Sequence, residues 1–114
     1  YALFGGGDTG SYSAVVDAYN TSLTRSTPTA LSVARYNLAA TSVGDYALFG
    51  GGYISSASDV SDVVDAYNTS LTRSTPTALS AARYNLAATS VGDYALFGGG
   101  LGSTYLNVVD VYAV

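Results

Sequence analysis

A near-identical internal repeat is the feature that most limits how this chain can fold. Residues 15–52 read VVDAYNTSLTRSTPTALSVARYNLAATSVGDYALFGGG, and residues 63–100 are the same except that Ala81 replaces Val33. The heptapeptide YALFGGG starts at Tyr1, Tyr46 and Tyr94, at spacings of 45 and 48 residues. Periods of roughly 40–50 residues are typical of propeller blades or solenoid turns. Identity this high indicates recent duplication or deliberate design.

Each repeat divides into four short segments with the composition of β-strands. They are small, β-branched or aromatic in character and are separated by Gly, Asp, Asn and Pro, which favour turns. Helix is disfavoured because apolar residues do not recur at helical spacing and Gly triplets interrupt every candidate. In the central copy the predicted strands are 36–43, 46–50, 63–68 and 71–75.

The strand YALFG has apolar side chains on both faces. Alternation places Tyr46 and Leu48 on one face and Ala47 and Phe49 on the other, so both faces require burial. A sheet covered by another sheet on each side meets that requirement. The Gly triplet that follows lets the backbone turn or approach a neighbour closely. The alternative interpretation of the Gly triplet is a flexible loop. A phosphate-binding loop is disfavoured because no helix or Lys follows the triplet.

These repeats resemble those of kelch-type β-propellers. The matching positions are the Gly pairs that close the second strand, the Tyr of the third strand and the Arg before the first strand: Gly5–Gly6, Gly50–Gly51, Gly98–Gly99, Tyr19, Tyr67, Tyr112, Arg35 and Arg83. The resemblance implies four-stranded blades around an axis. It also implies that the Arg residues form salt bridges or carbonyl contacts and that these Tyr residues belong to the core. Kelch repeats carry a fourth-strand Trp, whereas Leu23 and Leu71 stand nearest that place here, so we expect lighter packing between blades.

We therefore expect an all-β fold of about two and a half kelch-like blades in an incomplete ring. Residues 1–35 would hold the second to fourth strands of one blade, 36–83 a complete blade, and 84–114 the first to third strands of another. Repeat units cannot bury their apolar faces alone. We expect further blades or self-association, although joining copies edge to edge would omit two strands. Because Tyr1 is not a start codon residue and Met is absent, we expect a processed, excerpted or engineered chain.

The composition removes several classes of function. The chain has no His, Cys, Met, Trp, Lys or Glu, so it offers no thiolate ligand, no disulfide and no ordinary base near neutral pH. The copper-radical oxidases that share the implied fold need His, Tyr and Cys, and that chemistry is excluded within these residues. We expect no enzyme activity and no cofactor. A net charge of −4 disfavours nucleic-acid binding, and no apolar run approaches the roughly 20 residues that span a membrane.

One stretch in each repeat varies freely: residues 8–14, 53–62 and 101–107, between the second and third strands. A constant scaffold with a varying loop favours a binding or display module, suited to a bacterial or phage surface protein. The ligand would be a carbohydrate or a protein, and Tyr12, Tyr53 and Tyr105 are aromatic candidates to contact it. Neutral drift, a structural self-assembling repeat and an engineered propeller fragment are the alternatives. The full set of candidate contact residues is Asp8, Ser11, Tyr12, Tyr53, Ser55, Ser56, Asp59, Ser103 and Tyr105.

Two further motifs have ordinary explanations. Asp59, Asp62 and Asp65 are spaced by three, which places neighbours on opposite strand faces, so a solvated acidic loop is favoured over a calcium site. Asn20 and Asn68 begin Asn-Thr-Ser sequences that fit N-glycosylation, but a tight turn between the third and fourth strands explains them equally simply.

Overall fold

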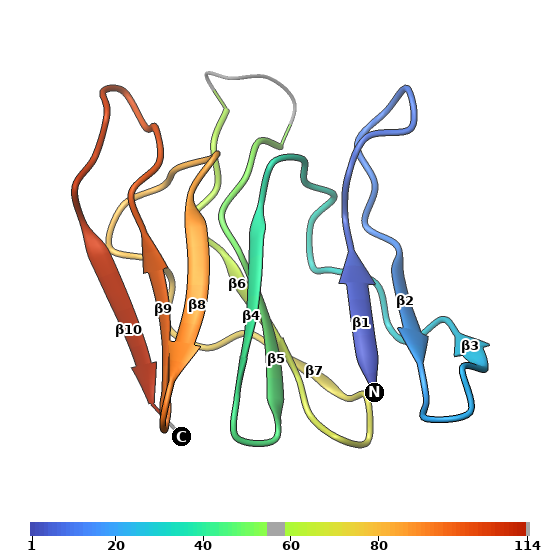
Figure 1. Ribbon diagram of the computed structural model, residues 1–114. Helices are drawn as coiled ribbons and strands as arrows, with labels where there is room; N and C mark the ends of the chain where they lie inside the picture. Colours follow the sequence, from blue (N-terminus) through green and yellow to red (C-terminus); the bar gives the residue numbers. More distant parts are fainter. Residues whose placement is uncertain (55–58, 114) are drawn as a thin grey trace.

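The computed structural model describes residues 1–54 and 59–113, which contain ten β-strands (Figure 1). Each strand falls within one of the segments expected to be extended. Their bounds are β1 Ala2–Gly5, β2 Val16–Tyr19, β3 Arg25–Ser26, β4 Ala39–Val43, β5 Tyr46–Gly50, β6 Val64–Tyr67, β7 Arg73–Ser74, β8 Ala87–Val91, β9 Tyr94–Gly98 and β10 Val109–Ala113.

The strands form three antiparallel sheets that stand side by side (Figure 1). We call them the first sheet (β1-β2-β3), the middle sheet (β4-β5-β6-β7) and the last sheet (β8-β9-β10). The all-β expectation is confirmed, because the described residues contain no helix. It follows that this part of the chain has no helix of the length and apolarity needed to cross a membrane.

One Gly–Phe pair recurs at the contacts between neighbouring sheets. A Cβ added to Gly5 of β1 would lie 3.0 Å from the ring of Phe49 on β5, and one added to Gly50 would lie 3.0 Å from the ring of Phe97 on β9. Leu48 and Phe49, on opposite faces of β5, are both buried. The prediction that this strand is covered on both sides is therefore confirmed, and the glycines allow the close approach.

Two strand boundaries differ from the prediction for a local reason. Leu71 has a φ of 61°, so the backbone is left-handed there, and its N–H donates to the carbonyl of Asn68 at 2.9 Å. The predicted strand at 71–75 was therefore wrong at its start, because β7 begins only at Arg73. Asn37, with a φ of 56°, interrupts the predicted strand at 36–43, so β4 begins at Ala39.

The Asn-Thr-Ser segments form the expected turns. The side-chain oxygen of Asn68 accepts hydrogen bonds from the backbone N–H of Ser70 and of Thr72, both at 3.0 Å. Asn20 makes the same pair of contacts in the first repeat. A side chain that satisfies two backbone donors in this way stabilises a turn locally, which accounts for the choice of Asn at this position.

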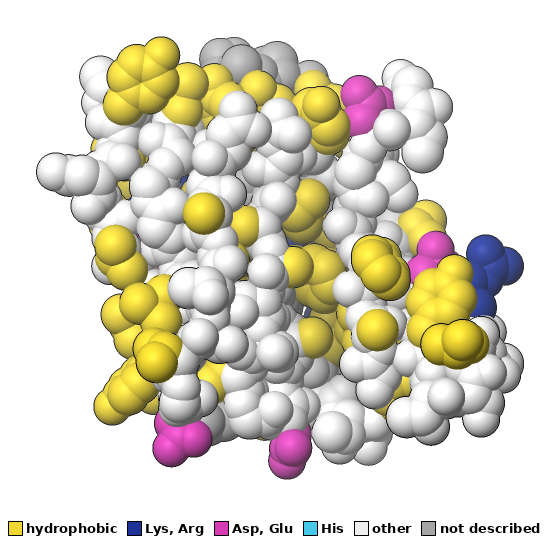
Figure 2. Space-filling view, in the orientation of Figure 1, with side chains coloured by type: hydrophobic (Ala, Val, Ile, Leu, Met, Phe, Trp, Pro, Cys, Tyr) yellow, Lys and Arg dark blue, Asp and Glu magenta, His cyan; other side chains and the backbone are white. Residues whose placement is uncertain are grey.

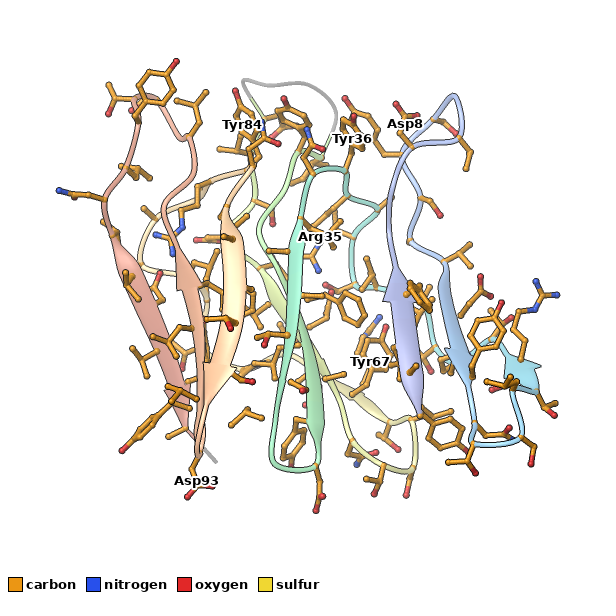
Figure 3. The ribbon with its side chains drawn as sticks, viewed as in Figure 1. Asp8, Arg35, Tyr36, Tyr67, Tyr84 and Asp93 are labelled. Carbon is orange, nitrogen blue, oxygen red and sulfur yellow. The ribbon has the colours of Figure 1, made fainter. Side chains whose placement is uncertain are left out.

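A buried ion pair fixes the segment that connects the first sheet to the middle sheet. Arg35 Nη2 lies 2.7 Å from Asp65 Oδ2, and both side chains are fully buried (Figure 3). The Arg35 guanidinium also donates to the carbonyls of Val63 and Phe49. The backbone N–H and hydroxyl of Ser32 donate to the same Asp65 oxygen at 3.1 Å. Burial lowers the pKa of Arg35, and the Asp65 carboxylate opposes that shift.

The same arrangement recurs one repeat later and is missing one repeat earlier. Arg83 pairs with Asp110 at 2.8 Å and donates to the carbonyl of Phe97, so both kinds of contact implied for these arginines are present. Asp17 occupies the corresponding position in the first sheet, where it accepts a 3.5 Å hydrogen bond from the Thr27 hydroxyl. Among the described residues it forms no ion pair.

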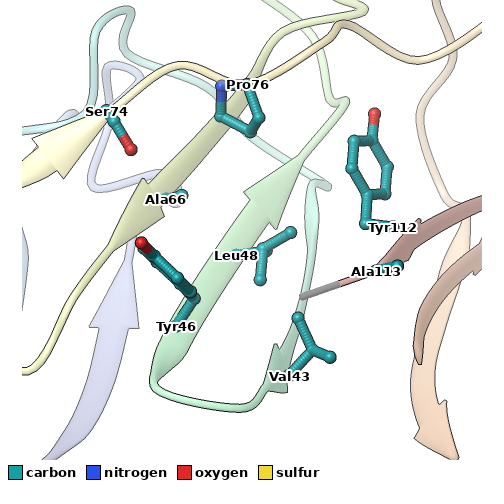
Figure 4. A pocket seen from close by; sticks show the side chains of 8 residues that line it. All are labelled: Val43, Tyr46, Leu48, Ala66, Ser74, Pro76, Tyr112 and Ala113. Atoms are coloured by element: carbon teal, nitrogen blue, oxygen red, sulfur yellow. The ribbon is translucent and has the colours of Figure 1, made fainter. Parts of the chain in front are cut away.

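The packing between the middle and last sheets is incomplete at the end that holds the tight turns. A groove of about 360 Å³ remains there (Figure 4). Its lining includes Ala66, Ser74 and Ala113, whose side chains are too small to fill it. Leu71 does not fill it either, because it belongs to the turn before β7.

We predict that the Asp65→Asn substitution destabilises the fold by about 3–5 kcal/mol, because it leaves the buried Arg35 without its counter-charge. Asp17→Asn is the matched control, since the same residue in the same repeat position has no arginine partner. It should change the free energy of unfolding by at most about 0.5 kcal/mol. Urea unfolding at a fixed protein concentration measures both, and equal effects would contradict the role given to the ion pair.

We also predict that stability falls as the pH rises above 10. Burial raises the pKa of Tyr67 and of Tyr112 to about 12, and their hydroxyls donate to the carbonyls of Thr29 and Thr77. The folded state therefore favours the protonated phenol. That stabilisation is complete below the ordinary pKa of 10 and is lost between pH 10 and 12. In urea titrations across this range, Tyr67→Phe should be less stable than the parent at pH 7 and lose less stability at high pH. An equal loss of stability between pH 10 and 12 in Tyr67→Phe and the parent would argue against this role of the Tyr67 hydroxyl.

Candidate functional site

The three variable loops lie together at one end of the row of sheets, which we call the loop end (Figure 1). Each loop joins the second and third strands of its repeat, and the antiparallel order brings all three to the same side. The segments that connect one sheet to the next also reach the loop end, whereas the Gly-Asp and Asn-Thr-Ser turns lie at the opposite end, as the labelled Asp93 illustrates (Figure 3). The loop end therefore combines the variable residues of all three repeats.

Each loop closes on itself through one backbone bridge. The residue that follows the Gly triplet pairs across its own loop: Asp8 with Tyr12, Tyr53 with Val60, and Leu101 with Tyr105. In the first loop, Asp8 Oδ1 accepts a hydrogen bond from the Gly10 N–H at 2.9 Å. These bridges hold the two ends of each loop together.

Four tyrosines from two different sources are in continuous ring contact at the loop end. Tyr12 and Tyr53 come from variable loops, and Tyr36 and Tyr84 come from the connecting segments. Ring centroids are 5.7 Å apart for Tyr12 and Tyr36 and for Tyr36 and Tyr53, and 6.4 Å apart for Tyr12 and Tyr53, with near-parallel planes in all three pairs. The centroids of Tyr53 and Tyr84 are 4.1 Å apart. We call this set the tyrosine row.

Backbone hydrogen bonds keep the tyrosine row in place. Tyr36 and Tyr53 exchange both backbone hydrogen bonds, at 3.1 and 2.8 Å, and Tyr84 exchanges both with Leu101. Asn85 N–H also donates to the carbonyl of Asn37 at 3.1 Å, which joins two successive connecting segments. The connecting segments thus bind the loops at the same point in successive repeats, and the rings stack as a result.

The two ends of this surface differ in accessibility. Tyr84 is buried, and this burial, followed by a hydrogen bond with Tyr53, raises its pKa. Tyr105, in the third loop, is 88% exposed. Tyr53 has the rings of Tyr12, Tyr36 and Tyr84 as neighbours, whereas the exposed ring of Tyr105 is accessible to a ligand.

The remaining candidate residues surround the row. Asp8, Ser11, Asp59 and Ser103 are exposed on the loops, and the carbonyl of Asp59 accepts a hydrogen bond from the Ile54 N–H. Ser55 and Ser56 lie outside the described residues. Tyr12 and Tyr53, which the sequence suggested as separate contacts, belong to one stack.

Sequence reasoning missed Tyr36 and Tyr84. Both were treated as the first residues of a strand, because a Tyr before a run of small residues fits an extended segment. The useful signal was the Asn that follows each of them. Asn37 and Asn85 are left-handed, with φ values of 56° and 53°, and Asn is the residue other than Gly that adopts this conformation most readily. A break at that Asn would have placed both tyrosines in the loop region.

The acidic residues do not converge. Asp65 is buried in the ion pair with Arg35, whereas Asp59 and Asp62 are exposed. Within residues 1–54 and 59–113, no group of three or more acidic side chains is arranged to hold a metal ion.

We predict that Tyr53→Ser destabilises the protein by about 1.5–4.5 kcal/mol, because it removes ring contacts with Tyr12, Tyr36 and Tyr84 of about 0.5–1.5 kcal/mol each. Tyr105→Ser is the control, since this ring is exposed, and it should stay within about 0.5 kcal/mol of the parent. Denaturant unfolding gives both values, and the near-ultraviolet circular dichroism of tyrosine should weaken only in Tyr53→Ser. A reversal of the two effects would show that the row is not a packed unit.

Comparison with known proteins reveals similarity of fold only. No protein-family model matches the chain, and no curated protein matches it in sequence. Among solved structures, the chain is similar to the structure of YjhT, with a TM-score of 0.66 and 17% sequence identity. The similarity covers 80% of this chain but only 28% of that chain, so the present chain corresponds to less than a third of YjhT. The arrangement of the three sheets is thus one that also occurs within a larger protein.

Proposed function

We propose that this chain is a segment of a kelch-like β-propeller that acts as a non-enzymatic binding module and contacts a protein partner through its loop end. Three sheets in a row with the same contacts between neighbours, together with the kelch-like positions of Gly, Tyr and Arg, support the propeller interpretation. The tyrosine row is the observation that carries the binding function.

The origin of the rings supports recognition by the loop end. Tyr36 and Tyr84 belong to the constant connecting segments, and they hold rings contributed by the variable loops. A change in one loop would therefore alter the surface without altering its support. Stacked rings lose little conformational entropy on binding, because they are already ordered in the free protein.

The geometry of the rings favours a protein over a carbohydrate. A sugar binds tyrosine by stacking on the ring face, but Tyr36 and Tyr84 already lie against Tyr53. Ring edges, hydroxyl groups and the neighbouring serines suit the polar, adaptable contacts of a protein interface. Carbohydrate is the second candidate, and the 88% exposure of Tyr105 is the observation that favours it.

The charge of the loop end indicates the character of the partner. Asp8, Asp59 and Asp62 lie on the loops and are exposed. Arg35 and Arg83 are buried, while Arg25 and Arg73 lie in β3 and β7. The described part of the loop end is therefore acidic, and a basic protein surface would complement it.

A non-enzymatic role agrees with the state of the reactive groups. The chain has no His or Cys, the Asp65 and Asp110 carboxylates are paired with arginines, and the Tyr67 and Tyr112 hydroxyls donate to backbone carbonyls. None of these groups is placed to activate a serine as a nucleophile.

We predict that the labelled chain binds selected basic proteins on a protein array and that Tyr12→Ser/Tyr105→Ser weakens this binding by about 10–100-fold. Added salt should also weaken it, because opposite charges are involved. Tyr94→Ser is the matched control: Tyr94 is 51% exposed but lies at the opposite end, so its removal should leave affinity unchanged.

A glycan array tested in parallel decides the ligand class. Binding to glycans alone, lost in Tyr105→Ser, would replace the protein partner by a carbohydrate. Equal affinity of the parent and the loop variant, or binding on neither array, would refute the function proposed for the loop end.

A further inference from the structure

One contact between sheets occurs twice within the chain. The ring of Phe49 lies against Gly5, and the ring of Phe97 lies against Gly50. In both cases the Phe comes from the second strand of one repeat and the Gly from the second strand of the repeat before it. Phe49 is 2% exposed and Phe97 is fully buried. Each Phe ring therefore occupies space that is open only because the residue opposite it is glycine.

Each half of this contact is also present once without its counterpart. Phe4 of β1 is 67% exposed, although it occupies the same repeat position as Phe49 and Phe97. Gly98 of β9 corresponds to Gly5 and Gly50, but a Cβ placed on it would have only Val109 Cγ2 within 4 Å, at 3.5 Å. The first sheet thus exposes the Phe, and the last sheet exposes the Gly.

The third strands show the same asymmetry. Val16 and Val64 are fully buried by the sheet that follows them, whereas the equivalent Val109 is 56% exposed. Ala18 and Ala66 are buried in the same way, whereas Val111 is largely exposed. We call the surface around Gly98, Val109 and Val111 the glycine face. Hydrophobic side chains are visible in this region of the molecule, over β9 and β10, and again over β1 and β2 (Figure 2).

The opposite surface belongs to the first sheet and is also apolar. Phe4 and Tyr19 meet edge to face with centroids 6.2 Å apart, as Phe49 and Tyr67 do in the middle sheet. Ala2 lies on the same strand face as Phe4 and is exposed. We call the surface around Ala2, Phe4 and Tyr19 the phenylalanine face.

We propose that the glycine face of one copy of this chain binds the phenylalanine face of a second copy, head to tail, with Phe4 seated on Gly98. The two interfaces already present within the chain supply the evidence for this occupant. The phenylalanine face has the same YALF strand whose Phe packs on Gly5 and Gly50 inside the chain, so it carries the Phe ring that fits the glycine face. The contact is between sheet faces and needs no strand to pair with another across the junction.

The internal interfaces also bury leucines of the connecting segments, such as Leu31 and Leu79, which the phenylalanine face does not supply. The apolar difference on the third strand can be accommodated. Val111 replaces the alanine found at positions 18 and 66. In the internal interface, Ala66 borders the groove of about 360 Å³ between the middle and last sheets (Figure 4). The larger Val111 would extend into the equivalent space at the junction between copies, so it adds apolar contact without requiring the sheets to move apart.

One polar residue makes the junction weaker than the internal interfaces. Asp17 lies on the phenylalanine face at the position of Asp65, but the part of the chain that the structure describes supplies no arginine to pair with it. Covering a carboxylate that has no counter-charge is costly. The junction is therefore expected to be reversible and to tighten when that charge is removed.

The geometry of this contact also limits the assemblies that can form. Two different surfaces meet, so the interface is heterologous, and successive copies add in one direction. Such an arrangement closes into a ring if the rotation between copies allows it, and continues as a filament if it does not. A symmetric dimer in which identical faces meet is excluded by the proposal.

The first experiment measures the mass of the intact chain in solution across a range of concentrations. The parent should associate reversibly, and Phe4→Ser and Gly98→Val should each weaken association by at least about 30-fold. Asp17→Asn should strengthen it. Tyr105→Ser is the control. It should associate like the parent, because this exposed ring lies on neither face. Circular dichroism verifies that each variant folds, and both Phe4 and Gly98 lie outside the internal interfaces.

The second experiment tests the direction of the contact. Ala2→Cys and Val111→Cys place one thiol on each face of a chain that has no cysteine of its own. Their counterparts Ala95 and Ala66 belong to one packed cluster in the internal interface. A short bismaleimide should cross-link a mixture of the two variants and neither variant by itself.

Three results would overturn the proposal. They are a parent chain that stays monomeric at every concentration, cross-linking within a single variant, and association that Phe4→Ser and Gly98→Val leave intact. Loss of ligand binding by the loop end would not bear on it, because the two faces lie on the sheets and not on the loops.

Discussion

The strand YALFG must be covered on both of its faces, and the rest of the structure depends on this constraint. Its alternating side chains are apolar or aromatic on each side, so a sheet that contains it buries both faces only between two neighbours. The Gly that ends the strand allows neighbouring sheets to pack closely, because it leaves room for a Phe from the next sheet. The sheets consequently stand in a row in which each contact repeats the one before it.

Apolar residues drive the packing of the sheets against each other, and polar residues determine its geometry. Arg35 and Arg83 reach from the connecting segments into the spaces between sheets, where each pairs with an Asp on the next third strand. Buried charges of this kind contribute less to net stability than to position, because their desolvation offsets much of their attraction. The ion pairs fix the position of each connecting segment and therefore the position of the tyrosine that follows each arginine.

Much of the fold could be predicted from the sequence, because its main determinants are local. The turns at Gly44 and Asn68, the strands around Leu48 and Ala66, and the burial of Phe49 follow from residue type and alternation. The start of β7 could not be predicted, because Leu71 adopts a left-handed backbone that its residue type disfavours. The hydrogen bonds of the neighbouring Asn impose this conformation. The tyrosine row was beyond local reasoning as well. It unites loops and connecting segments from different repeats, and only the placement of the sheets brings Tyr12, Tyr36, Tyr53 and Tyr84 together. The individual loop tyrosines were identifiable, but the stack that they form was not.

The two internal interfaces use the same residues at corresponding positions, and this has a consequence for how such a gene can change. Recombination between copies in register would insert or delete one whole unit, and every remaining sheet would still meet a surface for which it already has the right side chains. Array length can therefore vary without compensating substitutions, while the loops diversify independently of the number of units.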